Sequence, residues 1–246
     1  MNLLVCISKT PDTTARIAFK DDFTKFDDSG VQFIMNPFDE FYSLVRAIEL
    51  KEQFGGEVTV LNVGGPQNDI IIRKALAIGA DKAVRVNAEP TSAIFVAKQI
   101  AAYAKDKNFD IIFFGKETID YNGGEVQGMV AELMGLPFVN LASHLEVDGD
   151  TAKLNRDIEG GVERVEVKMP LVVAASKGMA EQRIPNMRGI MMAKRKPLEV
   201  IDAVAADDPV TTVKYELPKE KSGVKLIDPD NVEELVKLLH EEAKVI

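Results

Sequence analysis

The sequence is poor in the residue types from which catalytic and metal sites are most often built. Its 246 residues include one cysteine, Cys6, and two histidines, His144 and His240. A single cysteine excludes an internal disulfide and fits a reducing compartment. No cysteine or histidine cluster has the spacing of a zinc site, and two isolated histidines do not build a nucleophilic triad. We therefore expect neither a metal site nor a self-sufficient enzyme.

Long apolar runs and an excess of positive charge are also absent. No stretch approaches the ~18 apolar residues that a membrane span requires. The first residues, MNLLVCISKT, lack the basic segment and the small-residue cleavage site of a signal peptide. The 39 acidic and 30 basic side chains give a net charge of −9, whereas a general nucleic-acid binder needs a basic surface. We expect a cytoplasmic protein with no membrane insertion and no nucleic-acid partner.

Apolar runs of strand length alternate with helical patterns as far as Gly135. The expected strands are 3–7, 57–65, 83–87 and 110–115, and the expected helices are 36–54, 69–79, 91–107 and 126–135. Asn36 is the expected cap of the first helix, with Pro37 at its first helical position. This alternation predicts a doubly wound, mostly parallel sheet with right-handed crossovers, which is a Rossmann-like α/β fold.

From Val139 the pattern changes to strands separated by glycine turns. Segments 141–147, 151–158, 162–169 and 170–176 have strand patterns, which predicts antiparallel hairpins added to the sheet. After Leu198 the chain has little core pattern until an amphipathic helix over 231–246. We therefore predict a nucleotide-binding domain, 1–198, and a C-terminal arm, 199–246. Because an extended segment does not repay its ordering entropy alone, we expect the arm to lie on another polypeptide.

Residues 119–128, IDYNGGEVQG, are the strongest candidate for a ligand site. Ligands of open α/β sheets sit beyond the carboxyl ends of the strands, and segments 6–9, 36–39, 63–67 and 118–127 leave such ends. Gly123 and Gly124 let the backbone approach a ligand, and the helix that begins near Glu125 offers free N–H groups to a phosphate. The alternative is a plain strand-to-helix turn, and the negative charge of Glu125 opposes a phosphate. A Walker loop and a Gly-x-Gly-x-x-Gly motif are absent, so these residues alone leave both interpretations open.

A second unusual stretch is RIPNMRGIMMAKRKPLEVI, residues 183–201. It places Met187, Met191 and Met192 beside a basic run, 194–196, in an acidic protein. Exposed methionines make adaptable apolar contacts, and nearby basic charge steers acidic partners. The alternative is an ordinary helix with a methionine-rich core face and a solvated basic end.

Several segments, in order along the chain, carry a resemblance to one known family. They are MNPFDE (35–40), ALAIGAD (75–81), GKETID (115–120), RDIEGGVE (156–163), MP (169–170), IPN (184–186) and IMMAKRKPL (190–198). Over nearly its full length the sequence resembles the β subunit of electron transfer flavoprotein. The resemblance implies a heterodimer that carries electrons from flavin dehydrogenases, such as acyl-CoA dehydrogenases, to a quinone-reducing acceptor. In that family the α subunit holds the redox FAD, and the β subunit buries an AMP that takes no part in the chemistry.

The resemblance also implies roles for particular residues. Nucleotide contacts are implied for Cys6, Asn36, Pro37, Phe38, Asp39, Val63, Asp120, Asn122, Gly123, Gly124, Glu125, Val126 and Gln127. Thr13 falls near the flavin of the α subunit, and Glu163 matches an acidic residue that helps to hold the mobile flavin domain. Met187 matches the apolar anchor of a partner-recognition loop, 183–197, which also contains Ile190 and Met191.

Two alternatives to an AMP-binding carrier subunit follow from the same site. In electron-bifurcating relatives a second FAD replaces AMP and NADH is oxidised, and their turn reads like Asp-Gly-Asp-Thr-Ala-Gln-Val-Gly. Here the threonine and the glutamine of that turn are replaced by Gly123 and Glu125, which removes donors for a pyrophosphate. The second alternative is a homodimeric nucleotide-binding protein of the universal-stress type. The C-terminal arm argues against it, because the arm needs a foreign surface.

Overall fold

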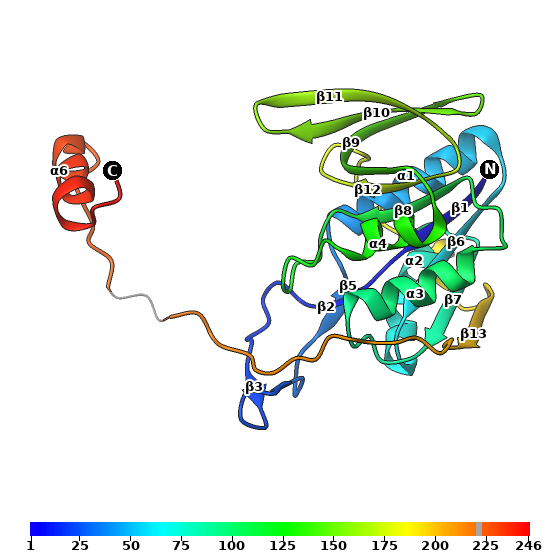
Figure 1. Cartoon of the computed structure of the whole chain (residues 1–246), viewed down its shortest axis with the longest axis horizontal. Coiled ribbons are helices and arrows are strands. Elements are labelled where there is room, and N and C mark those ends of the chain that lie inside the picture. The colour runs from blue at the N-terminus through cyan, green and yellow to red at the C-terminus, as the bar shows by residue number, and fades with distance from the viewer. Residues whose placement is uncertain (220–222) are drawn as a thin grey trace.

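Residues 1–219 and 223–246 are described by a computed structural model, and a nine-stranded sheet forms its centre (Figure 1). The strand order is β11-β10-β9-β12-β8-β1-β6-β7-β13. The bounds are β1 (Asn2–Cys6), β6 (Glu57–Val63), β7 (Lys82–Asn87), β8 (Ile111–Gly115), β9 (Phe138–Asp148), β10 (Thr151–Ile158), β11 (Gly161–Lys168), β12 (Leu171–Ala175) and β13 (Leu198–Asp202). The pairs from β12 through β8, β1, β6 and β7 to β13 are all parallel. The predicted doubly wound, mostly parallel α/β sheet is confirmed.

Helices cover both faces of the parallel strands. On one face, α1 (Asp39–Phe54) and α2 (Asp69–Ile78) pack in a core with Leu3 and Val5 of β1. On the other face, α3 (Ala93–Ala104) and α4 (Val126–Met134) pack with Leu4 and Cys6. Successive side chains of a strand point to opposite faces, so a continuous apolar strand such as β1 serves two cores.

The first helix begins later than the sequence predicts. It starts at Asp39 with Phe38 as its cap, rather than with Asn36 as cap and Pro37 at the first helical position. The Asn36 side chain bonds instead to the segment after β8, so a tertiary contact takes the place of a local cap. Phe38 has a φ of 63°, a left-handed conformation that is costly for a residue with a side chain.

The prediction of antiparallel strands after Val139 is confirmed for β9, β10 and β11 but is wrong for β12. Strand β12 runs parallel to both β8 and β9 and lies between them. All five of its residues are buried. A continuous apolar run is the pattern of a central parallel strand, whereas the hairpin strands alternate in burial. The outermost strand, β11, is therefore an exposed edge, and β12 is part of the core.

Several smaller elements lie outside the nine-stranded sheet. The antiparallel pairs are β2 (Lys9–Pro11) with β5 (Phe33–Met35), and β3 (Phe19–Lys20) with β4 (Lys25–Phe26). A 3-10 turn, η1 (Pro66–Asn68), leads into α2, and α5 (Met187–Ala193) packs on α2. No helix among the described residues has both the length and the apolar character needed to cross a bilayer.

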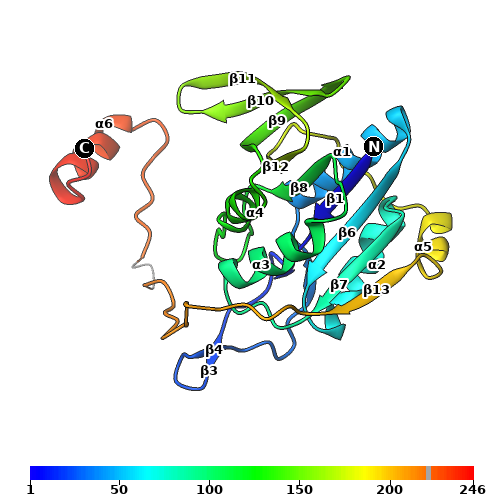
Figure 2. The same cartoon turned by 45° about the vertical axis from the view of Figure 1, so that its right-hand side comes forward.

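The chain ends in an arm that leaves the body. Residues 198–202 still belong to the sheet as β13, beside β7. The chain then runs past α3 and the β3–β4 hairpin to α6 (Val232–Lys237) and the π-helical turn η2 (Leu238–Glu242), which stand apart from the body in both views (Figures 1 and 2). The terminal helix is thus shorter than the predicted 231–246. The part of the expected extended segment at 220–222 lies outside the described residues.

Candidate functional site at the carboxyl ends of the strands

The carboxyl ends of β1, β6 and β8 meet at one edge of the sheet. Strand β1 lies between β6 and β8, and all three run parallel, so Cys6, Val63 and Gly115 end side by side. Cys6 and Val63 are buried there. Burial raises the pKa of the Cys6 thiol well above its ordinary value, so the side chain is an apolar wall and not a thiolate.

Asn36 joins the segment before α1 to the segment after β8. Its Nδ2 donates to the carbonyl of Glu117 at 3.0 Å, and its Oδ1 accepts from the N–H of Ile119 at 3.0 Å. The amide side chain is fully buried. A side-chain amide that pairs with a backbone N–H and a backbone C=O replaces one rung of a β-ladder. Two of the four predicted ligand segments are therefore held together by one residue.

The glycine turn after β8 keeps its shape through its own hydrogen bonds. The N–H of Thr118 donates to Gly123 O at 3.0 Å, and the N–H of Asn122 donates to Thr118 O at 3.0 Å. Gln127 is buried and donates to Lys116 O at 2.7 Å, which ties the start of α4 to the end of β8. A Cβ on Gly124 would lie 3.1 Å from that same Lys116 oxygen. These contacts fix the shape of the turn at the N-terminus of α4, where backbone N–H groups lack helical partners.

Two residues of the site, Glu40 and Ser8, were not singled out from the sequence. Glu40 is buried in the first turn of α1, and its carboxylate accepts from the N–H of Ser8 at 2.8 Å and from the Ser8 hydroxyl at 2.5 Å. Burial raises the pKa of Glu40 to about 8, against the effect of the Ser8 hydrogen bonds; Asp120 and Asp39 raise it further. The sequence signal for Glu40 was its place in MNPFDE, residues 35–40, one of the segments that carry the family resemblance.

The negative charge at the carboxyl ends of the strands is smaller than the number of carboxyl groups there suggests. Burial raises the pKa of Asp39 to about 6, with Lys116 opposing this shift and Glu117 adding to it. Glu40 is largely neutral at pH 7, because its pKa lies above that pH. Asp120 and Glu125 are exposed to solvent. The buried wall of the site therefore repels an anion less than a count of acidic residues implies.

Two buried asparagines, Asn62 and Asn68, support the neighbouring strand end. Asn62 donates to Ile7 O at 2.8 Å and accepts from Nδ2 of Asn68 at 2.8 Å. Oδ1 of Asn68 is buried without a hydrogen-bond partner within the described chain. A Cβ on Gly64 would lie 2.0 Å from the Asn68 amide, so only glycine fits between them. Asn62 interrupts an apolar strand, and that interruption is the signal by which the sequence reveals this pair.

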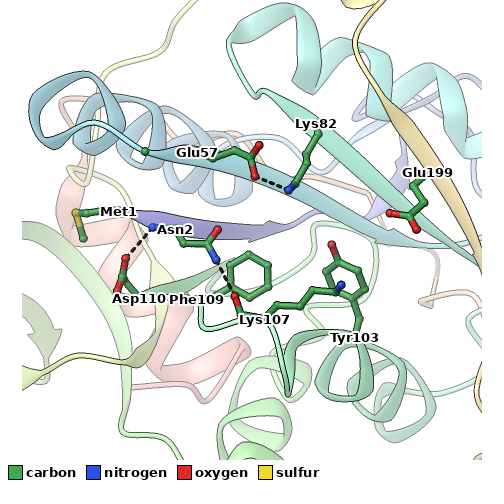
Figure 3. A pocket seen from close by; sticks show the side chains of 10 residues that line it. Met1, Asn2, Glu57, Lys82, Tyr103, Lys107, Phe109, Asp110 and Glu199 are labelled. Atoms are coloured by element: carbon green, nitrogen blue, oxygen red, sulfur yellow. Dashed lines mark hydrogen bonds and ion pairs between the residues drawn. The ribbon is translucent and has the colours of Figure 1, made fainter.

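A cavity of about 700 Å³ lies at the opposite end of the sheet, at the amino ends of β1, β6 and β7 (Figure 3). Several of its polar groups are paired with one another: Lys82 with Glu57, the N–H of Asn2 with Asp110 at 2.7 Å, and Nδ2 of Asn2 with Lys107 O at 2.8 Å. Ligands of doubly wound sheets bind at the carboxyl ends, where the polar groups converge here. We therefore assign the candidate site to the carboxyl ends of the strands and regard the cavity at the amino ends as a surface crevice.

Comparison with known proteins agrees with the geometry. The family model described as "Electron transfer flavoprotein domain" matches residues 24–206. The chain is 38% identical to the electron transfer flavoprotein subunit beta of Bacillus subtilis, with 100% of both chains covered. It is 36% identical to the protein of that name from Syntrophomonas wolfei, over 94% of this chain and 92% of that one. It is 32% identical to the human protein of that name, over 100% of this chain and 99% of that one.

The chain belongs to the electron transfer flavoprotein family. Membership implies electron transport by a flavoprotein, and nucleotide or flavin binding in general. The edge described above fits a nucleotide, because it offers the N–H groups of a helix start, tight glycine backbone and the unpartnered buried acceptor on Asn68. Among the described residues, no group of three or more His, Cys, Asp or Glu side chains is arranged to hold a metal ion.

Other family-implied residues lie in several separate places. Thr13 is exposed in the turn after β2, which is shaped by hydrogen bonds from Thr14 to the carboxylate of Asp12. Glu163 lies on edge strand β11, 3.4 Å from Arg156 on β10. Strand β11, which holds Glu163, lies away from helix α5, which holds Met187, Ile190 and Met191 (Figure 2). Of the four predicted partner-recognition residues, Glu163 is therefore separate from the other three.

The methionine-rich stretch of this electron transfer flavoprotein family member is an exposed helix. The side chain of Met187 is 74% exposed and that of Met191 68% exposed. Apolar side chains that share this exposure are Ile184, Met187, Ile190, Met191 and Met192, and we call them the α5 patch. The patch faces solvent and not the core, so the alternative of a methionine-rich core face is wrong. An exposed apolar patch beside basic side chains is typical of a docking surface.

Proposed function

We propose that this chain is the β subunit of a heterodimeric electron transfer flavoprotein. It shuttles electrons from flavin dehydrogenases, such as acyl-CoA dehydrogenases, to a quinone-reducing acceptor, with the redox FAD held mainly by the α subunit. The arm is the observation that supports this proposal most. Most of its valines and leucines are exposed, with Leu226 91% exposed, and α6 buries no residue. A segment of this length, ordered without burial, needs the surface of a partner chain.

The ligand that we propose for the carboxyl-end site is AMP. A mononucleotide has one phosphate, which suits a single helix N-terminus at α4. A pyrophosphate needs more donors, and Lys116, the basic side chain that follows β8, is paired with Glu117 at 3.3 Å. The residues at this edge bind and orient the nucleotide and hold no proton in transit. The nucleotide here is structural, and when bound in the α subunit the FAD supplies the electron-carrying chemistry.

Co-expression with the α subunit tests the proposal. We expect the two chains to co-purify as a 1:1 heterodimer, and acid release followed by nucleotide identification to yield one FAD and one AMP per heterodimer. Two FADs per heterodimer would reject AMP in favour of the electron-bifurcating alternative with NADH oxidation. A stable homodimer of this chain without affinity for an α subunit would reject the carrier proposal and favour the universal-stress type.

We further propose that the α5 patch is the docking surface for the dehydrogenase. Met187 is its most exposed helical residue, and the exposed basic side chains of Lys194 and Arg195 steer an acidic partner in a chain of net charge −9. Replacement of Met187 by alanine removes apolar contact area without removing a core contact. We expect Met187→Ala to raise the KM for a reduced acyl-CoA dehydrogenase about tenfold, which corresponds to about 1.4 kcal/mol of lost apolar contact. FAD content should not change; its loss would make the segment structural.

A further inference from the structure

Helix α5 is too short to order itself. It has seven residues, and Ala193 is its one buried residue. An isolated helix of fewer than about 12 residues is unstable in water, because the cost of nucleation is not recovered. The apolar side chains of the α5 patch face outward, and the most exposed of them, such as Met187 and Met191, contribute little to folding. Contacts on the inner side must therefore hold α5 in its place on α2.

The contacts between α2 and α5 are reciprocal. Arg73 of α2 donates through Nη1 to the carbonyl oxygen of Ala193, the last residue of α5, and to Lys196 O in the segment that follows, both at 2.7 Å. Lys196 donates through Nζ to Leu76 O at 2.9 Å and to Ala80 O at 2.5 Å, at the end of α2. The last carbonyls of a helix lack helical donors and carry partial negative charge. Helix α2 thus supplies a cation to the carbonyl that ends α5 and to the segment after it, and that segment supplies a cation to the carbonyls at the end of α2.

A glycine allows the two helices to lie this close. A Cβ on Gly189 would lie 2.5 Å from the carbonyl oxygen of Ala77. The start of α5 is held as well, because Asn186 Oδ1 accepts from the N–H of Gly189 at 2.8 Å. A close approach, an N-cap and two cationic caps restrain a helix that presents its methionines outward. We call the Arg73–Lys196 pair of caps the α2–α5 latch.

We propose that Arg73 and Lys196 are positioning residues for dehydrogenase docking, since the latch orders α5 before the partner arrives. This inference rests on the docking role proposed for the α5 patch. A preordered patch binds without the cost of folding, whereas an unlatched α5 presents its binding-competent form only part of the time. The apparent affinity then falls by that fraction.

The test uses the FAD-loaded heterodimer and a reduced acyl-CoA dehydrogenase. Lys196→Met removes the ammonium group and keeps the aliphatic stem. Lys194→Met is the matched control, because Lys194 is exposed and its loss removes the same charge from the same segment. Lys196→Arg is the conservative variant, which restores a cationic donor. Kinetics are measured at moderate and at about 1 M salt, where the Debye length is about 3 Å and steering by charge is screened.

For Lys196→Met we expect faster amide hydrogen exchange in 187–193 and a KM raised roughly three- to tenfold at both salt concentrations. Its kcat and FAD content should stay unchanged, and Lys196→Arg should restore KM. Lys194→Met should raise KM only at moderate salt and leave exchange unchanged. Unchanged exchange in Lys196→Met overturns the latch. Faster exchange with an unchanged KM overturns the positioning role. If Met187→Ala also leaves KM unchanged, the docking surface itself is wrong, and the exchange data still decide whether the latch orders α5.

Discussion

At the residue scale, the most unusual group in the candidate site is the carboxyl of Glu40. It is buried beside the end of β1, and burial raises its pKa from 4.5 to about 8 although Ser8 donates two hydrogen bonds to it. A carboxyl group that stays protonated at pH 7 adds no negative charge beside a nucleotide. The same burial makes the stability of the protein depend on pH.

The sign of the pH dependence of stability follows from the direction in which the pKa of Glu40 is shifted. Between about pH 5 and pH 8 the folded chain holds a proton on Glu40 that the unfolded chain has released. The free energy of unfolding therefore falls as pH rises through this window, by up to about 1.4 kcal/mol per pH unit from this group. We expect Glu40→Gln to flatten the slope, measured by urea unfolding across this pH range.

Glu132→Gln on α4 is the control for this measurement, because Glu132 is exposed and lies away from Ser8. It should leave the slope of the unfolding free energy against pH as it is in the parent chain. If Glu40→Gln also leaves that slope unchanged, another group carries the pH dependence, and Glu40 is ionised in the folded state.

At the scale of elements, the β3–β4 hairpin makes a direct contact with the C-terminal arm. The hairpin turn has three consecutive residues with positive φ, Asp21, Asp22 and Phe23. Such conformations cost about 1–2 kcal/mol per residue. The carbonyl of Phe23 accepts from the N–H of Tyr215 on the arm at 2.7 Å, and the Tyr215 ring stacks on Phe19 at 4.7 Å. The arm therefore stabilises a turn that is strained by itself.

We expect Tyr215→Ala to release both segments, because it removes a stacked aromatic pair worth about 0.5–1.5 kcal/mol. Amide exchange should accelerate in 19–26 and in 209–217, and limited trypsin digestion should cut sooner after Lys214. Tyr215→Phe keeps the stacked ring and should behave like the parent chain. Acceleration in the arm alone would mean that the hairpin holds its turn without help.

At the scale of the whole molecule, a well-packed body carries apolar surfaces that are left exposed by the fold. The body buries its apolar side chains in two cores, one on each face of the sheet. The α5 patch and the arm instead expose large apolar side chains. Helix α5 and the arm lie on different sides of the body (Figure 2). A body that meets several partners at separate surfaces suits a subunit that holds one protein permanently and another in passing. This arrangement supports the proposed carrier function.

Several features of this molecule followed from the order of its residues. The parallel strands were predictable because 3–7 and 110–115 are continuous apolar runs, which only burial on both faces explains. The glycine turn at 123–124 was predictable because a strand end followed by a helix start marks the ligand edge of such a sheet. Segment motifs spread over the whole length indicated the family, which the comparisons confirm.

Only the tertiary structure decided the features that depend on contacts between distant segments. Asn36 bonds to residues more than 80 positions away instead of capping its own helix, and Glu40 becomes neutral because β1 and α1 bury it together. Strand β12 lies parallel between β8 and β9, and Arg73 and Lys196 join the ends of α2 and α5 across about 120 residues. Local pattern determines what each segment forms, because it acts through neighbouring residues. Side chains find their partners, and carboxyl groups their pKa values, only when folding brings remote segments together.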